Sequence, residues 1–139
     1  MDSKQLAQST VDQFNDRSFR TRSKDLVDAN IVTVDGPTKQ EMHGPDGYVQ
    51  YNEGFVAAMP DIKGTVIGQE VNGNKVTTRV NAKGTFTGTM QMPQGKVPGT
   101  GKKLDIVYSF EMETNAAGKI TRYAVAYDMQ DFAHQLGLG

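Results

Sequence analysis

Largely apolar residues recur at helical spacing near the start of the chain. The stripe that they form between residues 2 and 14 predicts an amphipathic helix. Its members are Leu6, Ala7, Thr10, Val11 and Phe14. A shorter second helix is predicted to begin at Ser23, a residue type that caps helix N-termini, and to turn Leu26 and Val27 inward. The chain therefore opens with helices that each bury one face.

Helical spacing returns between Gly44 and Met59. Pro45 suits the first turn of a helix and Pro60 ends one, so both boundaries of this third helix are marked. Its apolar stripe contains Tyr48, Tyr51, Phe55 and Met59, with Val49 and Val56 at its edge. Such side chains usually pack in a core, and lining a cavity is compatible with that role.

After Pro60 the apolar pattern changes to the alternation of β-strands. The sequence Asn-Gly-Asn at 72–74 lies between two extended segments and predicts a hairpin, while 92–102 is interpreted as a looser connection. The predicted strands are 30–35, 62–71, 76–89, 104–114 and a last one that begins at residue 120. Three helices followed by a meander of antiparallel strands predict an α+β fold, with the helices packed on one curved sheet.

The last predicted strand places a carboxylate, Asp128, in an unusual position. Alternate side chains of a strand share a face, so Asp128 shares one with Arg122, Ala124 and Ala126. Because the two alanines leave space in front of the sheet, we expect Asp128 at the floor or wall of a pocket, as a general base. Two structural roles stay open for this side chain: an ion pair with Arg122, or capping of residues 129–136 if these are helical.

Length and composition restrict the class of protein. A chain of 139 residues suffices for about one domain, and we expect a single domain over residues 1–139. A net charge of −1 gives no reason to expect nucleic acid or an acidic membrane surface as partner. The absence of cysteine excludes disulfides and thiolate chemistry. The N-terminus lacks the apolar core of a signal peptide, and no stretch approaches the roughly 20 apolar residues of a membrane span, so we expect a soluble cytoplasmic protein.

Common catalytic and cofactor motifs are missing. The segment around Gly99 and Gly101 fits neither a phosphate-binding loop nor a dinucleotide-binding fingerprint. The two histidines, His43 and His134, are not at the spacing of metal ligands, and no serine lies in a Gly-x-Ser-x-Gly elbow. We therefore expect neither a metal ion nor an organic cofactor.

Five short motifs follow one another over roughly the C-terminal two-thirds of the chain. They are Ala57-Ala58-Met59-Pro60-Asp61, Gly84-Thr85-Phe86-Thr87-Gly88, Pro98-Gly99-Thr100-Gly101-Lys102, Gly118-Lys119-Ile120 followed by Asp128, and Gln135-Leu136-Gly137. In this order they resemble motifs of the SnoaL-like polyketide cyclases, also called ester cyclases. The family's versions read Ala-Phe-Pro-Asp, Gly-Thr-His-x-Gly, Pro-Thr-Gly-Lys, Gly-Lys-Ile…Asp and Gln-Leu-Gly.

The resemblance implies a nuclear-transport-factor-like fold. This is a cone-shaped α+β barrel in which three N-terminal helices pack on a strongly curved, mostly antiparallel sheet around a deep apolar pocket. It also implies intramolecular aldol ring closure on a polyketide ester, with Asp128 at the position of the family's acid–base aspartate. Two positions depart from the pattern: Phe86 replaces the motif histidine, and Ala124 stands where many members carry tryptophan. Proteins of this kind often dimerise through the sheet, so we expect a homo-oligomer, a dimer or a tetramer.

Aldol closure requires little from the protein beyond one base and a shaped pocket. A proton must leave a carbon flanked by carbonyls, and a carboxylate becomes basic enough when burial raises its pKa. A pocket that folds the substrate and excludes water completes the requirement. The residues predicted to line this pocket, for an apolar, polycyclic or polyketide-like molecule, are Tyr51, Phe55, Met59, Phe86, Tyr108, Phe110, Arg122 and Ala124.

Two classes of function stay open. The first is a cofactor-independent cyclase, or a related proton-transfer lyase or isomerase, that uses Asp128. The same fold also carries dehydratases, isomerases and epoxide hydrolases. The second is a non-catalytic module that binds an apolar small molecule or dimerises through its sheet. His43 is interpreted as a half-exposed surface residue, with a polar pocket group as the alternative.

Overall fold

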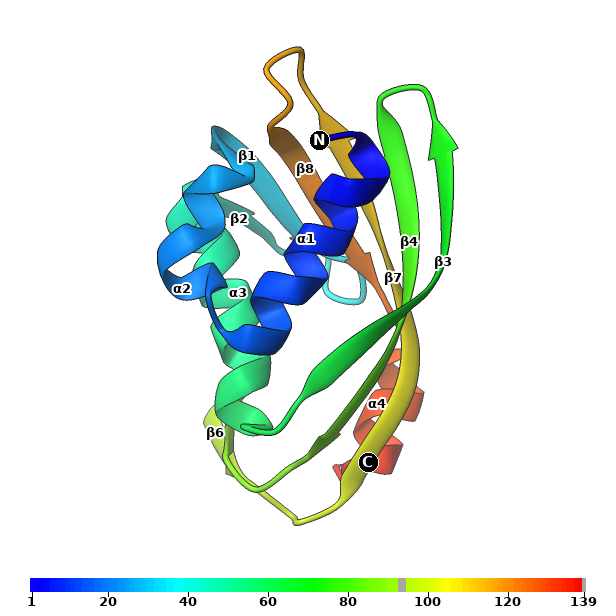
Figure 1. Cartoon of the computed structure of the whole chain (residues 1–139). Helices are drawn as coiled ribbons and strands as arrows, with labels where there is room; N and C mark the ends of the chain where they lie inside the picture. Colours follow the sequence, from blue (N-terminus) through cyan, green and yellow to red (C-terminus); the bar gives the residue numbers. More distant parts are fainter. Residues whose placement is uncertain (93–94, 139) are drawn as a thin grey trace.

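Helices cover one face of the molecule's sheet. The computed structural model describes residues 1–92 and 95–138. Its helices are α1 (Ser3–Asp16), α2 (Phe19–Arg22), α3 (Gly44–Ala58) and α4 (Met129–Gln135), with a short 3-10 turn, η1 (Ser23–Asp25), after α2. Figure 1 shows α1, α2 and α3 together on one side of the sheet, with α4 at its far end beside the chain terminus.

Six strands form the main sheet in the described part of the chain, in the order β2-β1-β8-β7-β4-β3. They are β1 (Val27–Asp35), β2 (Glu41–His43), β3 (Lys63–Asn72), β4 (Lys75–Thr85), β7 (Lys103–Thr114) and β8 (Ile120–Ala126). Neighbouring strands are antiparallel except β1 and β8, which run parallel. A separate two-stranded hairpin, β5 (Thr89–Met92) and β6 (Gly95–Pro98), packs near α3. The predicted α+β fold, with helices packed on a bent, mostly antiparallel sheet, is confirmed.

Local sequence signals set several element boundaries as predicted. A capping box closes the first turn of α1, since the Asp2 carboxylate accepts from the Gln5 backbone N–H at 2.8 Å and the Gln5 side chain accepts from the Asp2 N–H. Helix α3 ends at Ala58, two residues before Pro60. The hairpin between β3 and β4 turns at Gly73, whose φ of 67° is a conformation that glycine accepts without strain.

Other elements differ from the prediction. The segment predicted as a second helix from Ser23 forms only the 3-10 turn η1, after the separate helix α2. Leu26 and Val27 are buried as predicted, but Val27 belongs to β1. The reason is long-range pairing, because the Ile120 N–H donates to the Leu26 carbonyl and draws this segment to β8. The described residues form four helices rather than three, with α4 as the last, and the segment interpreted as a loose connection contains β6. The predicted strand 76–89 ends at Thr85.

Two clusters of buried side chains fill the space between helices and sheet. The first contains Leu6, Val11, Ile31, Tyr48, Phe110 and Tyr123, among others. The second contains Phe19, Met59, Phe86, Leu104, Phe132 and Leu136, among others. Tyr108 and Tyr127 pack against both clusters and therefore mark the boundary between them.

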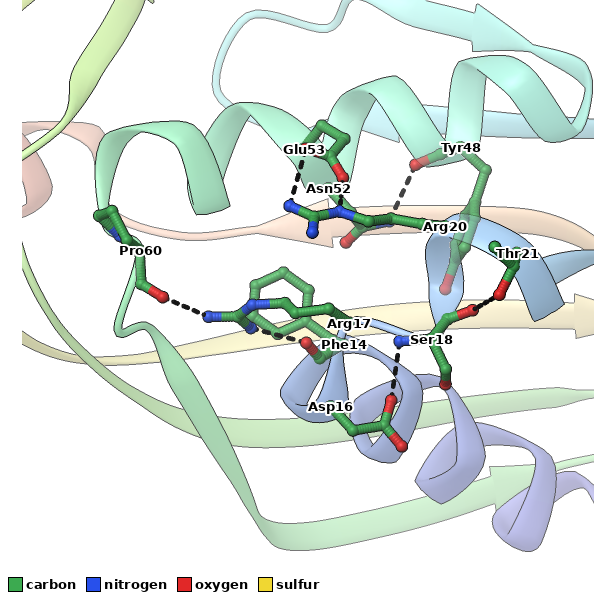
Figure 2. Close-up of polar contacts among 10 residues, drawn as sticks. All are labelled: Phe14, Asp16, Arg17, Ser18, Arg20, Thr21, Tyr48, Asn52, Glu53 and Pro60. Atoms are coloured by element: carbon green, nitrogen blue, oxygen red, sulfur yellow. Dashed lines mark hydrogen bonds and ion pairs between the residues drawn. The ribbon is translucent and has the colours of Figure 1, made fainter.

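Arg17 fastens the end of α1 to the chain segment that follows α3. It lies at φ 67°, and its guanidinium donates to the carbonyl oxygens of Phe14, Pro60 at 2.9 Å and Ile62 at 2.8 Å. Figure 2 shows the Phe14 and Pro60 contacts and, beside them, the ion pair between Arg20 and Glu53 of α3. These links hold the N-terminal helices over α3, so Phe14 is kept facing the interior.

Gly88 is the position in the fold least tolerant of a side chain. A methyl group there would lie 1.8 Å from the Ala57 carbonyl oxygen, a backbone atom that cannot move without disturbing the end of α3. We expect Gly88→Ala to destabilise the protein by more than about 3 kcal/mol, at the upper end for single substitutions. Urea unfolding followed by circular dichroism measures this change.

Gly54 supplies the matched control, because it lies within α3 and a methyl group there would meet nothing within 4 Å. Gly54→Ala should stabilise the protein by about 0.5–1 kcal/mol through its helix propensity. Equal effects of the two substitutions would contradict the close approach at Gly88.

Candidate functional site

An internal cavity lies where the two core clusters meet, between α3 and the sheet. Its walls are almost entirely apolar or aromatic and come from three helices (α1, α3 and α4), four strands (β3, β4, β7 and β8) and the segments before β3 and α4. The aromatic wall residues are Phe14, Tyr51, Phe55, Tyr108, Tyr123, Tyr127 and Phe132. The site is thus assembled from parts of the chain that are far apart in sequence.

The cavity has a volume of about 50 Å³. That is room for a few water molecules and about a third of the ~150 Å³ that accommodates a benzene ring. Three rings narrow it on one side, where Phe55, Tyr127 and Phe132 lie with ring centroids 5.3 to 6.3 Å apart. Any aromatic ligand therefore requires movement of these side chains or of α4, which carries Phe132.

All five tyrosines of the chain gather around this cavity. Four line it, and the fifth, Tyr48, packs edge-on against Tyr123 with ring centroids 5.2 Å apart. Burial raises the pKa of every one of these hydroxyls. At neutral pH they are consequently protonated and able to donate hydrogen bonds.

A buried carboxylate, Asp35, lies behind the tyrosines. Its side chain is only 6% exposed. The Tyr51 hydroxyl donates to one carboxylate oxygen at 2.7 Å, and the Thr38 hydroxyl donates to the other at 2.7 Å. The Thr38 backbone N–H also donates to this second oxygen, at 3.3 Å, so three donors already share the carboxylate's roughly four acceptor positions. Burial is the largest cause of the raised pKa of Tyr127, and the neighbouring Asp35 carboxylate is the second.

The local fold explains how Asp35 reaches this place. It is the last residue of β1, and its register partner on β8 is Val125, a residue of the cavity wall. The chain then turns sharply, with the Lys39 N–H donating to the Asp35 carbonyl and the Gly36 N–H donating to the Val125 carbonyl. A methyl group on Gly36 would lie 2.3 Å from that carbonyl, so glycine is required at the turn.

The structure places Asp128 outside the cavity. It is exposed, follows the end of β8 and is the N-cap of α4, where its carboxylate accepts from the Asp131 N–H at 3.1 Å. The expectation that Asp128 lies at the floor or wall of a pocket is therefore wrong. The physical reason is that β8 ends at Ala126 and the chain changes direction into a helix before Asp128. Capping, one of the two structural roles left open by the sequence, is the one observed.

An N-cap carboxylate contributes mainly to stability. We expect Asp128→Ala to destabilise the protein by about 1 kcal/mol, while Asp128→Asn keeps a capping oxygen and costs only a few tenths. Thermal unfolding of both variants measures the difference. Identical losses for alanine and asparagine would contradict the capping role.

Three of the eight residues predicted to bind substrate lie on the cavity wall: Tyr51, Phe55 and Tyr108. Met59, Phe86 and Phe110 are fully buried in the core clusters and are not among the wall residues. Arg122 and Ala124 are partly exposed members of the opposite face of β8. Arg122 lies 3.8 Å from Glu113 rather than beside Asp128, which excludes the predicted ion pair. Contact of any of these residues with a substrate stays a prediction.

Three ionisable residues at the site were not predicted from the sequence: Asp35, Tyr123 and Tyr127. Asp35 precedes Gly36-Pro37 and reads as an ordinary turn residue, so no local signal separates it from one. Tyr123 and Tyr127 alternate with Arg122 and Ala124. In a sheet with one solvated face, the more apolar row of side chains normally faces the core. The apolar character of the row that contains Tyr123 and Tyr127 is therefore the sequence signal that could have identified them. His43 lies at the surface, where its side chain is 71% exposed and 3.8 Å from Glu41.

The described residues form neither a metal-binding group nor a membrane-spanning helix. Within residues 1–92 and 95–138, no three His, Asp or Glu side chains form a group that could hold a metal ion. In the same described part of the chain, no helix is long and apolar enough to cross a membrane.

Comparison with known proteins identifies relatives of this arrangement. The family model of the SnoaL-like polyketide cyclases matches residues 4–136. No curated protein matches the chain. Among solved structures, a chain from Jannaschia sp. CCS1 assigned as a SnoaL-like polyketide cyclase superposes with a TM-score of 0.82 at 13% identity, covering 98% of this chain and 94% of that one.

Two Streptomyces proteins are also similar in structure. TsrD from Streptomyces laurentii has a TM-score of 0.81 at 16% identity and covers 100% of this chain and 99% of its own. IdmH from Streptomyces antibioticus, assigned as a polyketide cyclase, has a TM-score of 0.77 at 20% identity, with 96% and 97% coverage. At these identities the superpositions establish a shared fold.

Proposed function

Because the chain belongs to the SnoaL-like polyketide cyclase family, we propose that it closes a ring in a polyketide-like ester by intramolecular aldol addition, with Asp35 as general base. The observation that carries this proposal is the buried Asp35 carboxylate held at 2.7 Å by Tyr51, a residue of the cavity wall. Asp128, the base expected from the sequence, is exposed and engaged at a helix terminus. Burial beside a cavity favours Asp35 over Asp128.

The proposed reaction begins with proton transfer to Asp35. The carboxylate takes a proton from a carbon flanked by carbonyls, and the electron pair of that C–H bond becomes part of an enolate. The enolate carbon then attacks a second carbonyl carbon of the same molecule, which forms the new carbon–carbon bond and leaves an alkoxide. The protonated Asp35 returns its proton to this alkoxide. Atoms and charges balance without any external reagent.

The hydrogen bonds around Asp35 suit this role. Tyr51 and Thr38 each donate to a different carboxylate oxygen, so the group is fixed in orientation before substrate arrives. Preorganisation of this kind removes the reorientation that a solvated base would undergo during reaction. The apolar walls exclude water from the cavity. Asp35 is not itself a wall residue, so substrate reaches its carboxylate only when Tyr51 or a neighbouring wall side chain moves.

The walls also indicate the substrate class. Seven aromatic side chains surround the cavity, which favours a flat, apolar molecule such as an aromatic polyketide. The present volume of about 50 Å³ is too small for such a molecule. We infer that substrate enters when the rings of Phe55, Tyr127 and Phe132 separate.

Turnover of an anthraquinone-type ester tests the proposed function. The purified chain is incubated with the open ester, and ring closure is followed by chromatography against the uncatalysed reaction. Faster closure supports a cyclase. Saturable binding of the ester without closure would instead favour the non-catalytic binding module, and absence of both would overturn the proposed substrate class.

A further inference from the structure

Two tyrosine hydroxyls on the cavity wall have no partner. Tyr123 is 5% exposed, and neither its hydroxyl nor that of Tyr108 hydrogen-bonds to any protein group within residues 1–92 and 95–138. By contrast, the Tyr51 hydroxyl on the same wall is occupied by Asp35. Neither hydroxyl is among the fully enclosed polar atoms without a partner, which among the described residues belong to Gln13 and Thr33. Both tyrosines instead line the cavity, where a ligand can accept their hydrogen bonds.

The rings that carry these hydroxyls are held by their neighbours. Tyr123 lies between Tyr48, at 5.2 Å between ring centroids, and Phe110, at 4.8 Å. Tyr108 packs against Phe110 at 6.5 Å, and its hydroxyl lies beside Gly64, another wall residue.

The chemical character of the two groups is that of donors. Burial raises the pKa of Tyr108, and burial together with the neighbouring tyrosines raises the pKa of Tyr123. Both hydroxyls therefore keep their protons at neutral pH. The wall offers no lysine or arginine for a fully charged ligand, so the donors suit a neutral oxygen that gains negative charge during reaction.

We propose that the hydroxyls of Tyr108 and Tyr123 bind the carbonyl oxygen of the substrate and the enolate oxygen formed from it. This inference rests on the proposed function, in which Asp35 removes the proton from the adjacent carbon. The C–H electron pair moves toward the carbonyl, and the oxygen that becomes negative is held by two hydrogen bonds. The tyrosine protons stay on their own oxygens throughout. Binding strengthens as charge develops, which is the condition for lowering the barrier.

The test compares 2-naphthol, an aromatic enol, with naphthalene, which has the same ring system without oxygen. The chain has no tryptophan, so the fluorescence of either probe is measured without indole emission. Wild type should bind 2-naphthol more tightly than naphthalene. Tyr108→Phe and Tyr123→Phe should each weaken 2-naphthol binding about three- to tenfold, the value of one hydrogen bond, and leave naphthalene binding within about twofold.

Tyr48→Phe is the matched control, because Tyr48 is 2% exposed and adjacent to Tyr123 but is not a wall residue. It should leave binding of both probes unchanged. Since the Tyr108 and Tyr123 hydroxyls have no protein partner, their removal should keep or raise Tm, whereas a structural role would lower it. Equal affinities of wild type for the two probes, failure of 2-naphthol to bind, or unaltered 2-naphthol binding by both variants would overturn the inference.

The outcomes separate this inference from the proposed function. If the Tyr→Phe variants lose 2-naphthol selectivity but wild type does not close the ester ring, the oxygen-binding pair stands and the cyclase assignment fails. If wild type closes the ring and both variants do so at the wild-type rate, the cyclase assignment stands and the pair is wrong.

Discussion

Asp35→Asn should lower the rate of ester ring closure by about 10²- to 10⁴-fold, the usual contribution of a general base. Asparagine has nearly the same shape, and its carbonyl oxygen still accepts from the Tyr51 hydroxyl, which is bonded to Asp35 at 2.7 Å in wild type. The Thr38 hydroxyl can rotate to accept from the amide, and only the weaker bond from the Thr38 N–H, 3.3 Å long in wild type, is lost. The fold should therefore survive while the base is lost. Single-turnover kinetics measure the chemical step without interference from product release.

Asp128→Asn is the matched control for this experiment. It makes the same chemical change at the exposed carboxylate and preserves the helix cap. We expect its rate to stay within about twofold of wild type, because surface substitutions away from a site have small effects. A large loss in Asp128→Asn with a normal rate in Asp35→Asn would reverse the assignment and return the base to the residue expected from the sequence.

Alkaline pH should unfold the protein over a narrow range above pH ~10, the ordinary pKa of tyrosine. The pKa of all five tyrosines is raised in the folded state, mainly by burial. Above the ordinary pKa the unfolded chain therefore binds fewer protons than the folded chain, and stability falls as pH rises. Each tyrosine lowers the free energy of unfolding by at most about 1.4 kcal/mol for every pH unit in this range, so five tyrosines lower it by at most about 7 kcal/mol per pH unit.

That slope is large compared with the 5–15 kcal/mol stability that is common for domains. We expect tyrosinate absorbance and the loss of circular dichroism to change together, since ionisation occurs on unfolding. Tyr127→Phe should reduce the slope by about one fifth or less, because Tyr127 is only partly buried. Tyrosinate absorbance that rises near pH 10 while the circular dichroism stays native would contradict burial of the five hydroxyls.

Access to the cavity connects these predictions to function. Asp35 lies behind Tyr51 and Tyr127, and the cavity in front of it holds about 50 Å³. The α4 helix that carries Phe132 is held in place, because Phe132 is 5% exposed and the Gln135 side chain bonds to both the N–H and the carbonyl of Asp105. We expect a flat substrate to reach the base when the rings of Phe55, Tyr127 and Phe132 separate.

Local chemistry made much of the fold predictable. The capping box at Asp2 and Gln5, the prolines that bound α3 and the Asn-Gly turn after β3 each act within a few residues. Such signals depend on backbone geometry and short-range hydrogen bonds, which do not change with the rest of the structure. The motifs that resemble the SnoaL-like family extended this to the whole fold, and the family match over residues 4–136 confirms it.

The candidate site was predictable only in part. Alternation along β8 correctly separates Tyr123 and Val125 from Arg122 and Ala124, but a period of two does not say which face meets the helices. Asp128 at the end of one row suggests that this row faces a pocket, whereas the greater apolarity of the opposite row indicates that the opposite row is buried. The observed choice follows hydrophobic burial, since Tyr123 and Val125 are each 5% exposed.

What the sequence by itself determined is the fold class and most of the long elements, because these follow from periodicity, caps and turns. Only the tertiary structure decided the chemistry of the site. Asp35 ends a strand 16 residues before Tyr51, and the two unpartnered hydroxyls come from β7 and β8, far along the chain. These groups meet because the parallel pairing of β1 with β8 brings the Asp35 turn beside Val125 and the packing of α3 covers it. Such long-range contacts depend on how whole surfaces bury one another, and no short stretch of sequence encodes them.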